Sequence, residues 1–344
     1  MDLLSFFIIC VKVLLVFAGT LLAVLIMVYA ERRVSAFMQG RLGPNRVGPQ
    51  GLLQPIADGI KFLMKEDIIP DGVNKPIYLL APVIMLIPAL MTFAVIPFGS
   101  TITLFDRDII LQVADVNIGI LYILALTSIG VYGIVLAGWA SNSKYTLIGG
   151  LRSSAQLISY ELALGLSVVS IILMSGSLRL NDIVADQQGY FLSWYVFKQP
   201  LAFLIFLIAT YAETNRLPFD LAEAEQELVG GYHTEYSSMK FAMFFMSEYA
   251  NMITAAALTV TLFFGGWDVP LLDEKSLGLW GAMLSVASFI LKMGFFLFLF
   301  IWIRWTFPRF RYDQLMKLGW KVLLPLSLIN IFITGGYLTL AALK

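Results

Sequence analysis

Long apolar runs separated by shorter polar stretches dominate this chain. A helix that spans a bilayer needs about 20 predominantly apolar residues, and eight runs approach this length. They cover residues 3–29, 77–98, 118–140, 154–174, 200–212, 241–266, 279–305 and 322–343. The fifth run is long enough only if its helix starts near Trp194. Because backbone polar groups in lipid must pair within their own segment, we predict that each run is a membrane-spanning helix.

Two of the polar stretches also carry a regular pattern. Residues 51–67 place apolar side chains such as Leu52, Ile56 and Ile60 at nearly helical spacing, against polar ones such as Asp58 and Lys61. This pattern predicts an amphipathic helix that lies in the plane of the membrane interface. Residues 101–116 alternate between apolar and polar positions, which allows a short β-hairpin.

Basic residues are distributed unequally between the two sides of the predicted membrane. Most Lys and Arg residues lie in or beside the connections after the first, third, fifth and seventh runs. The opposite side, with both termini, carries Arg107, Arg179, Lys198, Lys275 and Lys344. By the positive-inside rule both termini lie outside, which is the periplasmic side of a bacterial inner membrane. The sequence thus predicts one all-α transmembrane domain, residues 1–344, with inner loops at 31–76, 141–153, 213–240 and 306–321.

The composition agrees with an integral membrane protein and argues against other classes. Of the 344 residues, 59% are hydrophobic and only 13% are charged, so lipid must solvate much of the apolar surface. The formal net charge of zero argues against a nucleic-acid partner. Cys10 is the only cysteine, so this chain cannot build an iron-sulfur cluster or a cysteine-based zinc site alone. Any redox centre must therefore belong to a partner chain.

Acidic side chains gather in the connection between the fifth and sixth runs. Residues 212–236 contain one arginine, Arg216, and the acidic residues Glu213, Asp220, Glu223, Glu225, Glu227 and Glu235. Glu213 and Arg216 have the spacing of an ion pair if the fifth helix continues that far. Asp220 and Glu223 have the spacing of a capping box for a short helix that ends near Gly230. Like charges this close to an apolar boundary favour proton uptake by at least one of them near neutral pH.

Two other interpretations of this acidic stretch stay open at the level of sequence. Acidic loops are often simply solvated. Clustered carboxylates also resemble a divalent-cation site, although the Glu-x-Glu-x-Glu spacing matches no specific ligand pattern, and we predict no metal here. His233, the only histidine, is expected to be a hydrogen-bonded structural residue.

Besides Lys12, whose long side chain can extend outward, and Arg304 at the end of its run, three ionisable residues lie within apolar runs: Glu161 in the fourth, Glu248 in the sixth and Lys292 in the seventh. An unpaired charge there costs about 2.5 to 3.5 kcal/mol by insertion scales, so such residues normally face a protein interior or water. A single one, such as Glu161, could instead reach the lipid headgroups. Together with the acidic stretch, the three predict a polar path from the inner surface toward the membrane midplane.

Several long motifs resemble those of one known family. They are ERR (31–33), RLGPN (41–45), GPQGLLQP (48–55), GGLR (149–152), SYE (159–161), AETNR (212–216), PFDLAE (218–223), WIR (302–304) and PRFRYDQL (308–315). In this order, and over most of the chain, they resemble the quinone-channel subunit of respiratory complex I, which is the family of H subunits of bacterial NADH-quinone oxidoreductases. Gln226 stands where that family more often has serine, which leaves the central motifs intact.

The resemblance implies a function and a role for particular residues. It implies a subunit at the heel of an L-shaped complex that docks the peripheral arm, borders the tunnel for quinone and couples quinone reduction to proton translocation. The resemblance implies no cofactor on this chain, with flavin and iron-sulfur clusters on partner subunits. The residues implied to border the tunnel, with the helix at 51–67, are Arg33, Arg41, Phe245 and Arg304. Those implied in proton transfer are Glu161, Glu213, Glu248, Asp220, Glu223, Glu225, Glu227, Glu235, Arg152, Arg216 and Lys292.

Two alternatives are compatible with the same pattern. One is the heel subunit of a related membrane-bound hydrogenase or ferredoxin-linked complex, which copurification of nickel rather than flavin would favour. The other is a stand-alone ion transporter, which would transport ions as a purified single chain. The sequence lacks the paired interruptions of apolar segments that are typical of transporters with inverted repeats.

Overall fold

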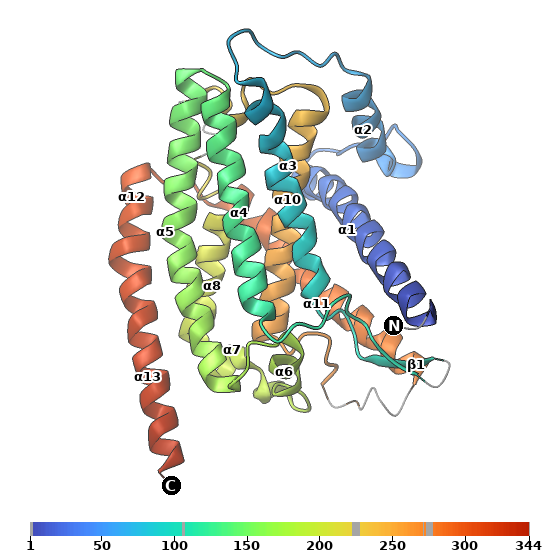
Figure 1. Ribbon diagram of the computed structural model, residues 1–344, viewed down its shortest axis with the longest axis vertical. Coiled ribbons are helices and arrows are strands. Elements are labelled where there is room, and N and C mark those ends of the chain that lie inside the picture. Colours follow the sequence, from blue (N-terminus) through green and yellow to red (C-terminus); the bar gives the residue numbers. More distant parts are fainter. Residues whose placement is uncertain (1–2, 105–106, 222–227, 271, 273–277, 344) are drawn as a thin grey trace.

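The computed structural model describes residues 3–104, 107–221, 228–270, 272 and 278–343, and helices make up most of them (Figure 1). Within this part of the chain, seven helices are long and apolar enough to cross a membrane, and α8 (Pro200–Glu213) is a shorter apolar helix. The long helices are α1 (Leu3–Met38), α3 (Lys75–Met91), α4 (Gly119–Ala140), α5 (Lys144–Ser175), α10 (Ser238–Phe263), α11 (Leu279–Thr306) and the helix that ends in α13 (Leu324–Ala342). The predicted all-α membrane fold is confirmed.

Helix α10 forms the centre of the bundle. Most of its residues are buried, and α1, α3 and α11 pack against it (Figure 1). Helices α3, α4, α5 and α8 pack as successive neighbours, and α13 lies at the periphery beside α5 and α8. Small residues such as Ala255, Ala256 and Ala257 let neighbouring helices approach α10 closely. The core therefore surrounds α10, while α1, α11 and α13 keep many apolar side chains on the outside.

Helices α1 and α5 are longer than the apolar runs alone indicate. Helix α1 continues to Met38 and α5 begins at Lys144, so residues 31–38 and 144–153 of the predicted inner loops are helical. Close packing explains why Gly149 lies within the helical residues 144–153. A Cβ atom on Gly149 would lie 2.9 Å from backbone atoms of Gly231. This glycine therefore allows a close approach of two segments and does not interrupt the helix.

The last apolar helix starts earlier than the predicted boundary at residue 322. Helix α12 (Tyr312–Lys317), a π-helical turn (Leu318–Leu323) and α13 follow one another without a break. Side chains of α5 hold the added turns in place. Tyr160 donates a hydrogen bond to the carbonyl of Leu315 (2.9 Å), and Trp320 Nε1 donates one to Ser159 Oγ (3.0 Å). Contacts with α5 thus extend the helix into a stretch that contains charged residues.

Two of the smaller predicted elements are present. The hairpin consists of β1 (Thr101–Leu104) and β2 (Arg107–Ile110), which pair antiparallel. The amphipathic helix is α2 (Gln54–Met64), whose Ile56, Ile60 and Leu63 are exposed. Its place at a membrane interface stays a prediction. The other short elements are the 3₁₀ turns Pro49–Gly51, Thr92–Val95, Phe191–Ser193 and Gly231–His233 and the helices α6 (Leu180–Ala185) and α7 (Tyr195–Lys198).

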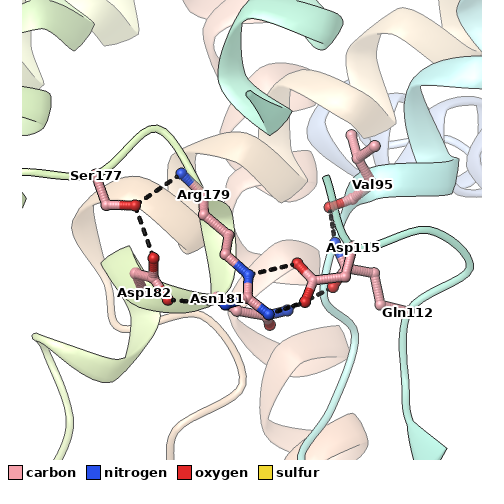
Figure 2. Close-up of polar contacts among 7 residues, drawn as sticks. All are labelled: Val95, Gln112, Asp115, Ser177, Arg179, Asn181 and Asp182. Carbon is pink, nitrogen blue, oxygen red and sulfur yellow. Dashed lines mark hydrogen bonds and ion pairs between the residues drawn. The ribbon is translucent and has the colours of Figure 1, made fainter. Parts of the chain in front are cut away.

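A polar cluster ties the connection after the hairpin to the start of α6 (Figure 2). Arg179 Nε donates to Asp115 Oδ1 (2.8 Å), and a second guanidinium nitrogen contacts the other carboxylate oxygen. In the same cluster, Asn181 Nδ2 donates to Gln112 Oε1 (2.6 Å). Because Arg179 hydrogen-bonds the charged carboxylate, it holds the pKa of Asp115 below its usual value.

Candidate functional site

Three carboxylates from different helices meet at one cavity. Glu161 of α5, Glu213 at the end of α8 and Glu248 of α10 line a cavity of about 30 Å³. The polar side chains of Thr214 and Asn251 belong to the same wall. A cavity of this size has room for about two water molecules. The structure thus brings together three ionisable residues that are far apart in the sequence.

Hydroxyl groups contact two of these carboxylates. Ser128 of α4 hydrogen-bonds to Glu161, and Tyr232 donates to Glu248 Oε1 (2.9 Å). Tyr232 is fully buried and Glu248 is 5% exposed. Tyr232 belongs to the 3₁₀ turn Gly231–His233, near the end of the acidic stretch. The end of the acidic connection therefore touches a residue of the cavity wall directly.

A second ionic cluster, the Glu31 cluster, consists of Glu31, Arg216, Tyr249 and Arg304. Arg216 Nη1 lies 3.3 Å from Glu31 Oε1, Arg304 forms an ion pair with the same oxygen, and Tyr249 donates to Oε2 (2.7 Å). The guanidinium group of Arg216 also lies over the ring of Tyr249, 4.5 Å from its centroid. Glu31 is only 7% exposed. A buried carboxylate needs such partners to offset the cost of its desolvation.

Sequence reasoning assigned no role to Glu31. The signal was weak, because the residue stands just past the end of the first apolar run, within the ERR motif. Helix α1 continues through Glu31 to Met38, which places the carboxylate inside the bundle. Its partners come from the segment after α8, from α10 and from α11. Only the tertiary structure could identify them.

The chain turns sharply between the cavity and the Glu31 cluster. Helix α8 ends at Glu213 and Asn215 has a φ of 50°, so the helical geometry expected for a Glu213–Arg216 pair is absent from this described segment. Residues 213–215 line the cavity, and the next residue, Arg216, reaches Glu31. One short segment therefore connects the two groups of charges.

The residues after Arg216 are fastened to the connection between α11 and α12. Asp220 Oδ2 lies 2.9 Å from Arg309 Nη2, and the backbone N–H of Phe310 donates to the carbonyl of Pro218 (3.1 Å). The rings of Phe219 and Phe310 stack with centroids 5.4 Å apart. Asp220, which was predicted to act in proton transfer, thus anchors this connection through an ion pair.

The other residues predicted for proton transfer fall into two groups. Glu223, Glu225 and Glu227, with the predicted capping box, lie outside the described residues. Glu235 is half-buried, and its backbone carbonyl accepts a hydrogen bond from the hydroxyl of a buried tyrosine (2.7 Å). Arg152 is half-buried on α5. A part in proton transfer stays a prediction for all five.

Lys292 lies away from the carboxylate cavity, at the C-terminal end of α10. Its Nζ donates to the carbonyls of Phe264 (3.0 Å), Gly266 (3.1 Å) and Asp268 (2.7 Å). The ammonium group also lies 4.7 Å from the ring centroid of Trp194. A cation is favourable where the last carbonyls of a helix point. The structure therefore does not join Lys292 to the carboxylates as the sequence predicted.

The residues expected to border a quinone tunnel lie along α1, α10 and α11. Arg304 of α11 pairs with Glu31, and Phe245 of α10 is one helical turn from the tyrosine of the Glu31 cluster. Arg33 lies near the end of α1, and Arg41 lies just beyond it and is exposed. Two of the four are thus in or near the Glu31 cluster.

The cavity is suited to binding and releasing protons. It presents carboxylates together with hydroxyl and amide groups. Among the described residues, no group of three or more His, Cys, Asp or Glu is placed to hold a metal ion. His233 is buried beside the rings of Tyr232, Phe241 and Phe245, where it contributes to packing.

Fold and site together define a class: an all-α integral membrane protein with ionisable residues gathered inside its helical bundle. Known proteins narrow this class to a family. A family model described as NADH dehydrogenase matches residues 11–335. The chain belongs to the family of NADH-quinone oxidoreductase H subunits, and the resemblance based on motifs is confirmed.

Three relatives illustrate this membership. The chain is 57% identical over 335 residues to an H subunit of the NADH-quinone oxidoreductase of Geobacter sulfurreducens, covering 94% of this chain and 93% of the relative. It is 58% identical to an H subunit of the corresponding enzyme of Geobacter metallireducens, with the same coverage. It is 50% identical over 330 residues to the H subunit of the NADH-quinone oxidoreductase of Flavobacterium johnsoniae, covering 95% of this chain and 93% of the relative.

Proposed function

We propose that this chain is the membrane subunit of a proton-pumping NADH:quinone oxidoreductase that borders the path of quinone and links quinone reduction to proton translocation. Family membership supports assembly with the other membrane and peripheral subunits of complex I in a bacterial membrane. Quinone is the substrate, and flavin and iron-sulfur clusters belong to partner subunits. The observation that carries this proposal is the cavity at which Glu161, Glu213 and Glu248 meet.

The three carboxylates interact because they share one small cavity. Three negative charges around such a cavity would repel one another strongly in a medium of low dielectric constant. Interacting carboxylates titrate as a group, so a proton gained by one changes the proton affinity of the others. A group of this kind can store protons and release them when the charge nearby changes.

The Glu31 cluster supplies a neighbouring charge that can change. Quinone near Arg304 or Phe245 would perturb the balance between Glu31 and its two arginines, because reduction adds negative charge that protons then neutralise. Arg216 belongs to this cluster and directly follows the residues of the cavity wall. A shift of Arg216 would therefore move Glu213 and Thr214 within the cavity.

Neutral variants of two cavity carboxylates test this proposal. In the assembled complex, Glu213→Gln and Glu248→Gln should each lower quinone-linked turnover about tenfold or more, because the carboxamide cannot exchange protons. Electron transfer from NADH to an artificial acceptor at the flavin should be unchanged. Asp186→Asn is the matched control, since Asp186 is exposed at the end of α6. Normal quinone turnover and proton pumping in both Gln variants would refute the proposal.

Purification in mild detergent tests the proposed partners. Chains that carry flavin and oxidise NADH should copurify with this subunit. A nickel-containing partner would instead indicate a hydrogenase-type complex. Ion transport by the purified single chain would contradict a role that depends on partner subunits.

A further inference from the structure

A second cavity lies beside the carboxylate cavity, one helical turn further along α8 and α10. Its volume is about 20 Å³, and it shares Thr127, Glu213, Thr214 and Asn251 with the first cavity. Beyond these shared residues, its polar lining comes from Thr210 and Thr254. Thr210 precedes Glu213 by three residues in α8, and Thr254 follows Asn251 by three in α10. Side chains at this spacing lie on one face of a helix.

The hydroxyl group of Thr210 sets this cavity apart. Thr210 is 1% exposed, and its Oγ1 is buried without a hydrogen-bond partner in the described part of the chain. A buried threonine in a helix commonly donates to the carbonyl four residues before it. Thr259 and Thr261 of α10 do so, to Ala255 (2.7 Å) and Ala257 (2.8 Å). An unsatisfied polar group in a native structure calls for an explanation, and an ordered water is one of the few available.

The cavity meets the requirements of a water site. A water molecule needs roughly 10–15 Å³ of accessible volume and two to four polar partners. The wall offers the Thr210 hydroxyl, the Glu213 carboxylate, the Asn251 amide and the Thr254 hydroxyl. Thr254 Oγ1 also lies 3.0 Å from Thr92 Oγ1, so a hydrogen-bonded group continues behind it.

We propose that the second cavity binds one ordered water molecule, held by Thr210, that hydrates Glu213 beside the carboxylate cavity. The water stabilises the charged form of Glu213, because it adds a hydrogen bond, beside that of Thr127, to a carboxylate that burial desolvates. Thr210 is then a positioning residue that acts on Glu213 through the water. The role of Glu213 in turnover rests on the proposed function, whereas the water site itself does not.

Thr210→Val, which replaces the hydroxyl with a methyl group of similar size, separates a water site from a dry cavity. In a dry cavity this change removes an unpaired hydroxyl, so the melting temperature of the assembled complex stays the same or rises. In a water site the Val variant lacks a hydroxyl group that binds the water, so its melting temperature falls. The Thr210→Ser variant keeps the hydroxyl group, so its melting temperature stays close to that of the wild type. Thr259→Val is the matched control, because that hydroxyl is bonded within α10 and lies outside both cavity walls.

Two measurements on the assembled complex complete the test. A high-resolution cryo-EM map should show one density within hydrogen-bond distance of Thr210 Oγ1 and Glu213, and this density should be absent in Thr210→Val. In the same variant, the acidic limb of quinone-linked turnover should move up by about one pH unit, with Thr210→Ser close to wild type.

The outcomes separate the two proposals. An empty cavity in a map that shows neighbouring ordered waters overturns the water site. A pH profile unchanged by Thr210→Val overturns the positioning role. Normal turnover and proton pumping in both Glu213→Gln and Glu248→Gln would refute the proposed function, whereas the water density in the wild-type complex would still stand.

Discussion

At the residue scale, buried charges in this protein depend on partners that are distant in the sequence. The Glu31 carboxylate is 9% exposed and contacts Arg216, whose side chain is also 9% exposed, as well as Arg304. Arg32, the next residue along α1, pairs with Asp58, but its side chain is 47% exposed. An exposed pair contributes little to stability, whereas removal of one partner from a buried pair is costly.

Glu31→Gln should therefore destabilise the subunit by about 3 kcal/mol. The change removes the negative charge that both Arg216 and Arg304 contact, and leaves two guanidinium groups facing a neutral amide. Thermal unfolding of the assembled complex measures the effect. Asp58→Asn is the control, with an expected loss of less than about 1 kcal/mol. Equal stability losses in the two variants would contradict this assignment of the Glu31 cluster.

At the scale of elements, lysine side chains hold both ends of the central helix α10. Near its start, Lys240 Nζ lies 2.7 Å from Asp67 Oδ1. Beyond its end, Lys292 reaches three carbonyl groups. These carbonyls belong to Phe264, the C-cap residue of α10, and to Gly266 and Asp268 just beyond it, and a cation near a helix C-terminus interacts favourably with the helix dipole. The lysines thereby tether both ends of the helix that carries Glu248 and Asn251.

Lys292→Met should loosen the C-terminal end of α10. Methionine keeps most of the side-chain volume but cannot donate hydrogen bonds, and the loss of a charged donor costs about 1.5 to 3 kcal/mol. Hydrogen exchange of the backbone amides at residues 260–266 should become faster. Lys12→Met, which removes a single bond to the carbonyl of Gln112 (3.2 Å), should leave that exchange unchanged. Unchanged exchange in Lys292→Met would show that the three bonds do not stabilise this helix end.

The contact between the hairpin connection and α6 should depend on pH. The pKa of Asp115 is lowered by its hydrogen bonds from Arg179. Its stabilising contribution is therefore complete above the unfolded value of about 3.9, and is lost as the pH falls through the lower folded value. The pair is partly exposed, so the contribution is about 1 kcal/mol at most. The stability difference between wild type and Asp115→Asn should be present at pH 7 and should shrink as the pH falls below the unfolded pKa of about 3.9. If the stability difference between wild type and Asp115→Asn grew as the pH fell, folding would raise the pKa of Asp115 and not lower it.

At the scale of the whole molecule, a few ionisable groups gather within a largely apolar core, while the outer helices also keep many apolar side chains on the outside. Glu161, Glu213 and Glu248 face a cavity between α4, α5, α8 and α10. Leu14, Leu291 and Phe332, on the outer helices α1, α11 and α13, are strongly exposed. Lipid or the apolar surfaces of partner subunits must cover these side chains. The orientation of the bundle in the membrane stays a prediction that rests on the distribution of Lys and Arg among the loops.

Cysteine labelling tests this orientation. In a Cys10→Ser background, Asp186→Cys lies on the predicted outer side and Lys144→Cys on the predicted inner side, and both positions are exposed. A membrane-impermeant maleimide added to intact cells with a permeabilised outer membrane should label only the cysteine at position 186. Inverted membrane vesicles should give the opposite result. Labelling of position 144 in intact cells would overturn the predicted orientation.

Local pattern predicted the elements of this fold better than their ends. The hairpin at β1 and β2 and the helix at α2 follow from alternation and from helical spacing, which are local properties. The starts of α5 and α12 were predicted too late. The start of α5 is stabilised by the packing of Gly149 against Gly231. Helix α12 is stabilised by the hydrogen bond from the Tyr160 hydroxyl to the carbonyl of Leu315. Such contacts join segments that are distant in the chain, so they produce no regular pattern of apolar and polar residues from which they could be predicted.

The fold class, the family and the interest of Glu161, Glu213 and Glu248 can be read from the amino-acid order alone, because apolar run length, motif order and charge within an apolar run are local features. Which charges meet depends instead on the tertiary structure. It joined those three carboxylates at one cavity, gave Glu31 two arginines and placed Lys292 at the end of α10. The physical reason is that the partner of a buried charge is set by how helices pack, and packing brings together residues that the order of the chain keeps apart.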